Sequence, residues 1–208
     1  MITVIIANYK YKHLLSQCID SVISQTRKPD RILVIDDNSE DISDVCNKYG
    51  VEYIIRKDNL GTVENFRQAF NEVTTDKVMF LGADNWLRLD ALELMDKEDA
   101  DIVSSDISLC GTELDTFRQA LNTEYKDGYH IWRFKEGNIE KGNYIHGSSL
   151  YNVEIAKKVG GYERNKDSKN TEEDWMLWRK MLRAGAKHKH IKEPLLYYRR
   201  HEDNFIKI

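Results

Sequence analysis

The residues of this chain that could do chemistry are mainly carboxylates and amides, and they stand in pairs directly after apolar segments. A hard divalent cation such as Mg²⁺ or Mn²⁺ prefers carboxylate oxygens and leaves coordination positions for substrate phosphates. Three pairs therefore suggest the binding of a nucleotide and a metal ion: Asn8-Tyr9, Asp36-Asp37 and Asp84-Asn85.

Asp84 is the clearest candidate for a metal ligand. It follows the apolar run 78–81 and precedes Trp86, so a short strand would deliver its carboxylate to the edge of a sheet. One carboxylate is enough for a cation when a diphosphate supplies further oxygens. The alternative is that Asp84 and Asn85 only form an Asx-type turn, which these residue types also favour.

A second acidic group precedes a segment with apolar residues at helical spacing. Acids in this position complement the positive end of a helix dipole. A carboxylate in the same position can also take a proton from a hydroxyl group as a general base. The residue types alone leave both interpretations open for Glu172, Glu173 and Asp174.

The elements that must position these residues alternate between strand and helix in the first half of the chain. Apolar, β-branched runs predict strands at 2–7, 31–36, 51–55 and 77–81, and helical spacing predicts helices at 14–23, 43–49 and 62–73. Strands separated by helices imply a parallel sheet with helices on both faces. In such sheets ligands bind beyond the carboxyl ends of the strands, where the three polar pairs fall.

The second half of the chain is less regular. Residues 111–142 show no clear period, and we expect a long, partly ordered excursion of the kind that is usually functional or mobile. Helices are predicted at 152–159, before Gly160, and at 171–184, with Thr171 as the N-cap. The segment 194–201 predicts a short strand that ends in a basic cluster.

Composition limits the class of protein. The chain has 208 residues, 41% of them hydrophobic and only 2 of them proline, which suits one globular domain and argues against disorder. The net charge is −4, so the chain does not have the overall positive charge that unspecific nucleic-acid binding requires, although the stretch after residue 168 is locally basic. Three scattered cysteines suggest neither a disulfide framework nor a zinc knuckle. With no signal-peptide or membrane-spanning run, we expect a cytoplasmic protein, and a peripheral encounter with a membrane stays open.

Several nucleotide-enzyme motifs are absent from the sequence. No Gly-x-Gly-x-x-Gly follows the first predicted strand and no Gly-x-x-x-x-Gly-Lys-Ser/Thr occurs, which argues against dinucleotide-dependent oxidoreductases and P-loop enzymes. No Gly-x-Ser-x-Gly nucleophile elbow is present either.

Motifs along nearly the whole chain resemble those of family 2 glycosyltransferases of the GT-A fold. Each is weak alone, but they occur in the family's order, at 4–9, 18–26, 32–39, 59–61, 80–85, 159–162, 173–175 and 198–201. The resemblance implies an α/β fold with a Rossmann-like, mostly parallel sheet flanked by helices and a smaller C-terminal acceptor-side region. It implies a single domain over 1–208, with residues 1–105 binding the nucleotide-sugar and 106–208 carrying the acceptor side and the catalytic base.

The resemblance also implies positions for the donor. In that family the loop after the first strand and the second Asp of an Asp-Asp-x-Ser element hold the base, most often uracil. Asn65 and Arg67 fall in a donor-contacting segment, where Arg67 either meets phosphate or lies on a solvated helix face. The expected donor-binding residues are Ala7, Asn8, Tyr9, Asp37, Asn65, Arg67, Asp84 and Arg199.

For the metal, Asp84 matches the family's metal-binding Asp, and Mn²⁺ or Mg²⁺ is the implied cofactor. The chain departs from the family's Asp-x-Asp or Asp-Asp motif, because Gly82 and Asn85 occupy places where acids are common. This departure implies weak metal affinity or a tighter dependence on the donor diphosphate. His201 resembles a C-terminal histidine that completes the metal or diphosphate site in some relatives; the alternative is a surface histidine beside two arginines.

For catalysis, Asp174 takes the place of the family's general base, with Glu172 and Glu173 as backups. The implied reaction is a single inverting displacement that moves a sugar from a UDP-sugar or another nucleotide-diphosphate sugar to a hydroxyl. The acceptor is a glycan, a lipid-linked glycan or another hydroxyl compound, with protein and nucleic acid left open. Acceptor specificity is expected within residues 111–150.

Two other functions compete with this interpretation. A nucleotide-sugar-binding protein with weak or no catalysis would explain the depleted acidic motif. A nucleotidyltransferase would keep the α/β sheet, but the Gly-rich loop after the first strand that is typical of that class is missing from residues 8–12.

Overall fold

The computed structural model describes residues 1–111, 123–167 and 172–201. Four parallel strands form the first half of the chain: β1 (Ile2–Asn8), β2 (Arg31–Asp36), β3 (Glu52–Ile55) and β4 (Lys77–Gly82). Three helices connect them: α1 (Lys12–Ile23), α2 (Ser43–Tyr49) and α3 (Thr62–Asn71). The predicted alternation of strand and helix is confirmed for these seven elements.

The rest of the described chain extends this sheet. A short strand and a helix follow β4, namely β5 (Trp86–Leu87) and α4 (Ala91–Asp96), and then the long strand β6 (Ile102–Gly111). A hairpin comes next, made of β7 (Glu124–Lys126) and β8 (Tyr129–Trp132). The chain continues through β9 (Leu150–Asn152), α6 (Val153–Lys158), α7 (Glu173–Arg183) and β10 (His188–Arg200).

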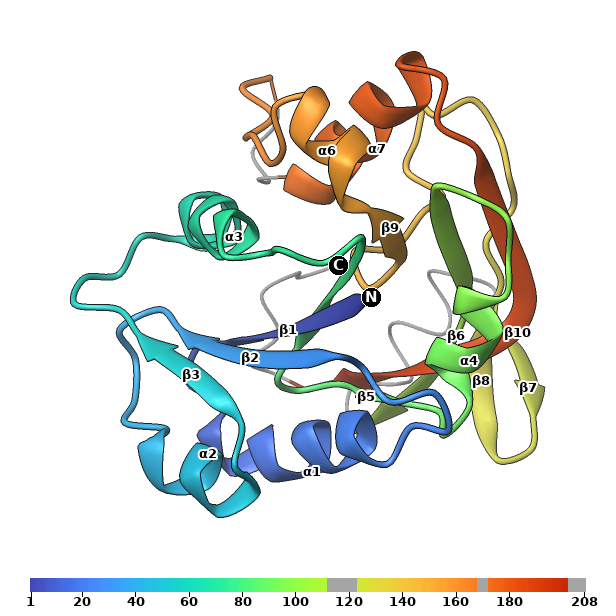
Figure 1. The fold of residues 1–208 in the computed structure, drawn as a ribbon. Helices are drawn as coiled ribbons and strands as arrows, with labels where there is room; N and C mark the ends of the chain where they lie inside the picture. The colour runs from blue at the N-terminus through green and yellow to red at the C-terminus, as the bar shows by residue number, and fades with distance from the viewer. Residues whose placement is uncertain (112–122, 168–171, 202–208) are drawn as a thin grey trace.

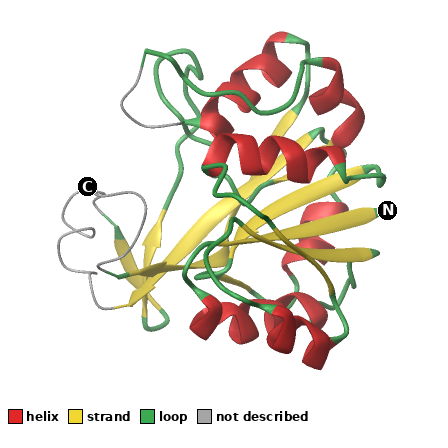
Figure 2. Ribbon diagram, turned by 90° about the vertical axis from the view of Figure 1, so that its left-hand side faces the viewer, coloured by secondary structure: helices red, strands yellow, loops and turns green. Residues whose placement is uncertain are grey.

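All strands belong to one mixed sheet in the order β3-β2-β1-β4-β9-β6-β10-β5, with the β7–β8 hairpin attached to β6. β9 is antiparallel to both of its neighbours, whereas β10 runs parallel to β6. Figure 1 shows α1 and α2 below the sheet and α3, α6 and α7 above it. The turned view in Figure 2 shows the same three layers, with helices on both sides of the strands. The expected architecture is confirmed.

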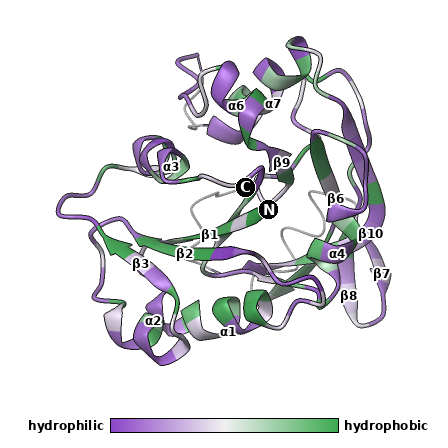
Figure 3. Ribbon diagram, viewed as in Figure 1, coloured by the Kyte–Doolittle hydropathy of each residue, from purple (hydrophilic) through white to green (hydrophobic). Residues whose placement is uncertain are grey.

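Successive side chains of each strand point to opposite faces of the sheet, and they form two hydrophobic cores, one on each face. Val4 and Ile6 of β1 pack with α1, α2 and α4, whereas Ile5 faces α3, α6 and α7. The helices contribute one apolar face each, such as Leu177, Trp178 and Met181 in α7. In Figure 3 the inner strands are mostly hydrophobic and the outer sides of the helices hydrophilic. Burial on both faces fixes where each strand ends and therefore where its polar terminus lies.

The second half differs from the prediction in three places. β10 begins at His188 and not near Pro194, because a polar run that resembles a loop in sequence pairs with β6. Within 111–142, expected to lack regular structure, the chain forms the β7–β8 hairpin; residues 112–122 lie outside the described residues. α7 begins at Glu173, and its predicted N-cap, Thr171, also lies outside the described residues.

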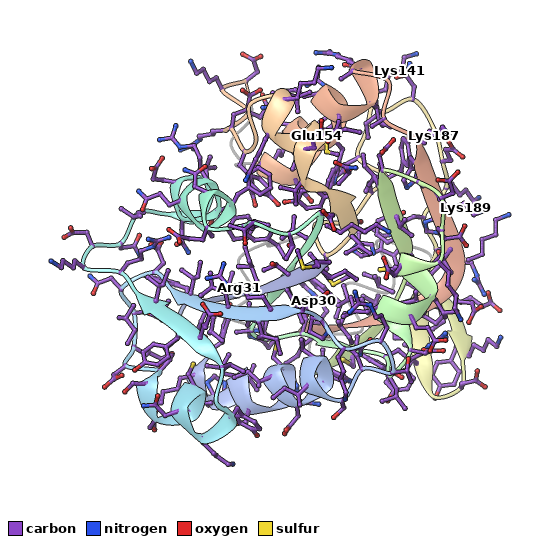
Figure 4. All side chains as sticks on the ribbon, in the orientation of Figure 1. Asp30, Arg31, Lys141, Glu154, Lys187 and Lys189 are labelled. Atoms are coloured by element: carbon purple, nitrogen blue, oxygen red, sulfur yellow. The ribbon has the colours of Figure 1, made fainter. Side chains whose placement is uncertain are left out.

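The first part of β10 is an open strand edge in the part of the chain that the structure describes, because β5 pairs only with Leu196 and Tyr197. Figure 4 shows Lys187 and Lys189 at the outer edge of the molecule beside this stretch. Charged lysines on an edge strand discourage pairing with other chains. These residues account for part of the basic character of the C-terminal stretch. No helix among the described residues is long and apolar enough to cross a membrane.

Candidate active site

The carboxyl ends of β1 and β2 form the first part of the site. Asn8 is buried and its Nδ2 donates to Asp36 Oδ2 at 2.6 Å. Asp36 also accepts from the backbone N–H of Ser39 at 2.7 Å, so its carboxylate holds the turn after β2. Asp37 N donates to the Asn8 carbonyl at 3.2 Å, which brings two of the predicted donor residues together. Ala7, half-buried, and Tyr9, with 43% of its surface exposed, flank Asn8.

Asp37 lies at the centre of this part of the site. Its carboxylate oxygens accept from the backbone N–H groups of Leu60 at 2.9 Å and of Gly61 at 2.8 Å. Gly61 has φ +74°, a conformation that favours glycine, and it directly precedes α3. The Asp37 carboxylate thereby fixes the entry of α3 next to the ends of β1 and β2. Its role toward a nucleobase stays a prediction.

The two predicted residues on α3 lie in different environments. Asn65 is buried, and its Oδ1 accepts from Arg56 Nε at 3.2 Å. Arg67 points away, with 58% of its side chain exposed, and pairs with Glu64 at 2.6 Å on the same helix. The solvated alternative considered for Arg67 therefore describes its position. Arg56 directly follows β3 and was missed, although that position at a strand end was a usable signal.

The segment after β4 is a compact turn held by hydrogen bonds. Asn85 Nδ2 donates to Asp84 Oδ1 at 2.9 Å, and Arg199 N donates to Asn85 Oδ1 at 2.9 Å. Arg199 Nε donates to the Asp84 carbonyl at 3.1 Å. A Cβ at Gly82 would lie 2.6 Å from Asp84 Oδ1, so no side chain fits there unless the carboxylate moves. The folded-back carboxylate explains why glycine stands at this position.

The side chains of Asp84 and His201 approach each other. Asp84 Oδ2 lies 3.4 Å from His201 Nε2, and Tyr11 packs edge-on against the imidazole at 5.1 Å. Burial raises the pKa of Asp84, and the hydrogen bond with His201 opposes that shift. These two residues come from strand ends that lie far apart in the sequence.

The Asp84–His201 pair fits a hard divalent cation. Two metal–ligand bonds of about 2.1 Å at roughly right angles place their donor atoms about 3 Å apart, close to the observed separation. No cluster of three or more His, Cys, Asp or Glu side chains suited to a metal occurs among the described residues. A Mg²⁺-type site with few protein ligands completes its coordination with substrate phosphate and water. The residues present are therefore compatible with a cation that arrives with a diphosphate.

Asp174 lies in the first turn of α7, partly buried against the segment 139–147. Its Oδ1 accepts from Trp175 N at 2.7 Å, and Asn143 Nδ2 approaches Oδ2 at 3.5 Å. Burial and the neighbouring charge of Glu173 raise the pKa of Asp174 to about 7. A carboxylate with a pKa near neutrality suits a general base. Glu172, one of the two backups, is engaged by Asn165 Nδ2 at 2.6 Å.

Hydrogen bonds from α7 hold the segment 139–147 next to Asp174. Trp175 Nε1 donates to the Ile139 carbonyl at 2.7 Å, and Arg179 Nε donates to Glu140 Oε2 at 3.0 Å. These contacts hold the backbone that faces Asp174. This segment lies within residues 111–150, where acceptor specificity is expected; its contact with α7 was not predicted, since no sequence period marks the segment.

The charges of both carboxylates act on the hydroxyl of Tyr198. Tyr198 is half-buried on β10, and burial together with the negative charges of Asp84 and, to a smaller extent, Asp174 raises the pKa of its hydroxyl.

A glycine contact leads to a testable prediction about Asp174. A Cβ at Gly147 would lie 3.3 Å from Asp174 Oδ2, close enough to displace the carboxylate by a few tenths of an ångström. We expect Gly147→Ala to lower kcat by about tenfold, since small misplacements of a catalytic group are costly. Gly142→Ala is the matched control, because nothing lies within 4 Å of a Cβ there. The measurement is the steady-state kcat of both variants. Equal kcat values for Gly147→Ala and Gly142→Ala would contradict the expected effect on Asp174.

The mixed sheet places carboxylates and a histidine beyond the carboxyl ends of its strands, the edge at which open α/β proteins bind their ligands, so the chain belongs to the class of open α/β proteins. The family model described as Glycosyl transferase family 2 matches residues 3–160, and the chain belongs to this family.

Two curated relatives are similar in sequence to this chain over part of their length. GlyA, a glycosyltransferase of Streptococcus pneumoniae, is 31% identical over 103 residues, which cover 47% of this chain and 15% of GlyA. An uncharacterized glycosyltransferase of Nostoc sp. is 36% identical over 90 residues, which cover 40% of this chain and 28% of that protein. The matched segments thus span well under a third of these relatives.

Solved structures agree in fold over nearly the whole chain. TarS 1–349 of S. aureus, in complex with UDP-GlcNAc, matches with a TM-score of 0.72 at 15% identity, over 98% of this chain and 59% of TarS 1–349. The mannosyltransferase PcManGT of Pyrobaculum calidifontis, in complex with GDP-Man and Mn²⁺, gives a TM-score of 0.69 at 15% identity, over 98% of this chain and 58% of that protein.

Proposed function

We propose that this protein is a metal-dependent, inverting glycosyltransferase that moves a sugar from a nucleotide-diphosphate donor, most simply a UDP-sugar, to an acceptor hydroxyl. The observation that carries the proposal is the approach of Asp84 Oδ2 to His201 Nε2, at 3.4 Å, beyond the carboxyl end of the parallel strand β4. This carboxylate stands beside a histidine and suits a cation. The carboxylate of Asp174 has a pKa near 7 and suits proton removal.

The proposed binding site for the donor nucleotide lies at the carboxyl ends of β1 and β2. Asn8 Oδ1 is buried and finds no hydrogen-bond donor within 1–111, 123–167 and 172–201, although buried polar atoms are rarely left unpaired. Asp37 is buried and its backbone N–H donates to the Asn8 carbonyl, Asn65 is buried on α3, and Tyr9 is exposed enough to stack on a base. TarS is recorded with UDP and with UDP-GlcNAc, which supports a uridine nucleotide for this chain.

In the proposed reaction, Asp174 accepts the proton of the acceptor hydroxyl as its oxygen attacks the anomeric carbon. The bond from that carbon to the donor phosphate breaks, and its electron pair leaves with the nucleoside diphosphate. Attack opposite the leaving group inverts the anomeric centre in one step, so an α-linked donor gives a β-linked product. Asp84 and His201 would hold a Mn²⁺ or Mg²⁺ ion, which supplies positive charge at the departing phosphate.

The rate should depend on pH through Asp174. A general base works only when ionised, so we expect kcat/KM to rise about tenfold per pH unit below the pKa of about 7 and to level off above it. The charge of Asp174 raises the pKa of the Tyr162 and Tyr198 hydroxyls, and the charge of Glu173 raises the pKa of Asp174. Glu173→Gln removes a like charge, so it should move the rising limb to lower pH. A profile that is flat between pH 5.5 and 8.5 would count against Asp174.

The function is tested with a panel of UDP-, GDP- and TDP-sugars in the presence and absence of Mn²⁺. Thermal shift reports binding, and release of nucleoside diphosphate reports turnover. We expect the largest shift and metal-dependent release with a UDP-sugar. Tight nucleotide binding with no release under any condition would favour the nucleotide-sugar-binding protein, a role that the absence of acids at Gly82 and Asn85 makes worth testing.

A further inference from the structure

We propose that Asn143 is a positioning residue for Asp174: its side-chain amide holds Oδ2, the carboxylate oxygen that takes the proton of the acceptor hydroxyl. The inference rests on the proposed function and adds a residue on the acceptor side of the reaction. Asn143 lies in the segment 139–147, between β8 and β9, where no sequence period marks a strand or a helix.

The two carboxylate oxygens of Asp174 have different surroundings. Oδ1 accepts from Trp175 N at 2.7 Å. Asn143 Nδ2 donates to Oδ2 at 3.5 Å, and a Cβ at Gly147 would lie 3.3 Å from the same oxygen. The short hydrogen bond stabilises negative charge on Oδ1 more than the long one does on Oδ2. Oδ2 is therefore the oxygen that receives the proton, and Asn143 is the side chain that orients it.

A second hydrogen bond sets the orientation of the Asn143 amide. Its Oδ1 accepts from Ile145 N at 3.1 Å, so Nδ2 is the atom that is turned toward Asp174. Ile145 is fully buried and packs in the same core as Leu177 and Trp178 of α7. An amide nitrogen donates and does not accept, so its contact favours the ionised form of the carboxylate. The ionised form is the one that acts as a base.

The chain is anchored on both sides of Asn143. On one side, Glu140 accepts from Arg179 Nε at 3.0 Å and from Arg183 Nε at 2.7 Å, both on α7. On the other side, Ile145 is held in the core. Asn143 itself is exposed, so one amide meets both the carboxylate and the solvent from which an acceptor would approach. The anchored backbone keeps this amide next to the base.

Other titratable groups interact with Asp174 as well. Burial and then the charge of Glu173 raise the pKa of Asp174, and the hydrogen bond from Asn143 opposes this shift. After burial, the charge of Asp174 contributes to the raised pKa of the Tyr162 and Tyr198 hydroxyls. A substitution of Asn143 leaves all of these groups in place. A change in the titration of Asp174 therefore reports the contribution of the amide.

The test follows the carboxyl carbon of Asp174 by ¹³C NMR in a pH titration of the full chain without substrate, with the signal assigned by its loss in Asp174→Asn. Asn143→Asp keeps an oxygen for Ile145 N, loses the amide donor and adds a negative charge. We therefore expect it to raise the titration midpoint by about one pH unit or more. Asn143→Ala should raise the midpoint by less. The rising limb of UDP release from a UDP-sugar, with water as the acceptor, should move with the midpoint in both variants.

Asn138→Ala is the matched control, because Asn138 is also exposed and its Oδ1 accepts from Glu140 N at 2.9 Å in the same kind of turn. It should leave the midpoint unchanged. If Asn143 only formed its turn, Asn143→Asp would leave the midpoint unchanged too, and that result would overturn the inference. Equal shifts in Asn143→Ala and Asn138→Ala would overturn it as well. Absence of UDP release from every UDP-sugar by the unaltered protein would instead overturn the proposed function, whatever the midpoint.

Discussion

Replacing Asp174 with asparagine is expected to lower the rate of sugar transfer by about 10²- to 10⁴-fold, the usual contribution of a general base. Asparagine keeps the size of the side chain, and its Oδ1 can still accept from Trp175 N, so the turn that starts α7 should persist. It has no basic oxygen to receive the proton of the acceptor. UDP affinity should stay within about twofold, because Asp174 belongs to the acceptor side of the reaction.

Stability separates this catalytic role from a structural one. The fold raises the pKa of Asp174 to about 7, so the folded protein favours the neutral carboxyl more than the unfolded chain does. Stability from this group is therefore complete at low pH and is lost as the pH rises through 7. Asparagine does not titrate, so Asp174→Asn should unfold at a higher temperature than the unaltered protein at pH 8, with the difference shrinking toward pH 4.

A purely structural role of Asp174 predicts the opposite result. If the acid only complemented the positive end of α7, its replacement would lower the unfolding temperature at pH 8 and leave turnover nearly unchanged. Glu173→Gln is the matched control, because Glu173 occupies the same helix turn. It should retain turnover at high pH. Single-turnover rates and thermal unfolding of the two variants, measured side by side, decide between the interpretations.

The first half of the fold could be predicted because each of its elements follows one period. Strands buried on both faces are continuous apolar runs, as in Ile2–Asn8, and the helices between them show a single apolar face. β10 could not be found whole, because its first part is a polar edge with alternating histidine and lysine. The β7–β8 hairpin carries exposed residues on its first strand, so no apolar alternation marks it.

The sequence could predict candidate residues where a polar residue directly follows a strand. Asp84 follows β4 and His201 follows β10, and the structure brings these two side chains within 3.4 Å, while their role toward a metal stays a prediction. The approach of Gly147 to Asp174 could not be predicted, because it depends on how the segment 139–147 packs on α7.

The neighbours Arg199 and Arg200 show a further limit of prediction from sequence. β10 has register shifts on both sides of Pro194, so counting alternate residues from its start does not tell which arginine reaches the Asp84–Asn85 turn. The contacts of Arg199 with the Asp84 carbonyl, Trp86 and Gln17 show that it is Arg199.

Asp84→Asn should have the second large effect, a loss of about 10²-fold or more in metal-dependent transfer, because the single carboxylate of the proposed metal site becomes an amide. The variant keeps the size of the side chain, so the hydrogen bond from Asn85 and the contact with Arg199 can persist. Donor hydrolysis and transfer, titrated with Mn²⁺, give the measurement. A Mn²⁺ response identical to that of the unaltered protein would remove Asp84 from the metal site.

Asn85→Asp is the matched gain-of-function variant, since it restores an acid where the family often has one. Asn85 Nδ2 now donates to Asp84 Oδ1 at 2.9 Å, so two carboxylates at that spacing would repel each other without a cation. We therefore expect a lower unfolding temperature in the absence of metal, a larger rise on adding Mn²⁺, and half-maximal activity at a lower Mn²⁺ concentration. Loss of stability that Mn²⁺ does not restore would mean that the turn binds no cation and that Asn85 serves only to hold Arg199.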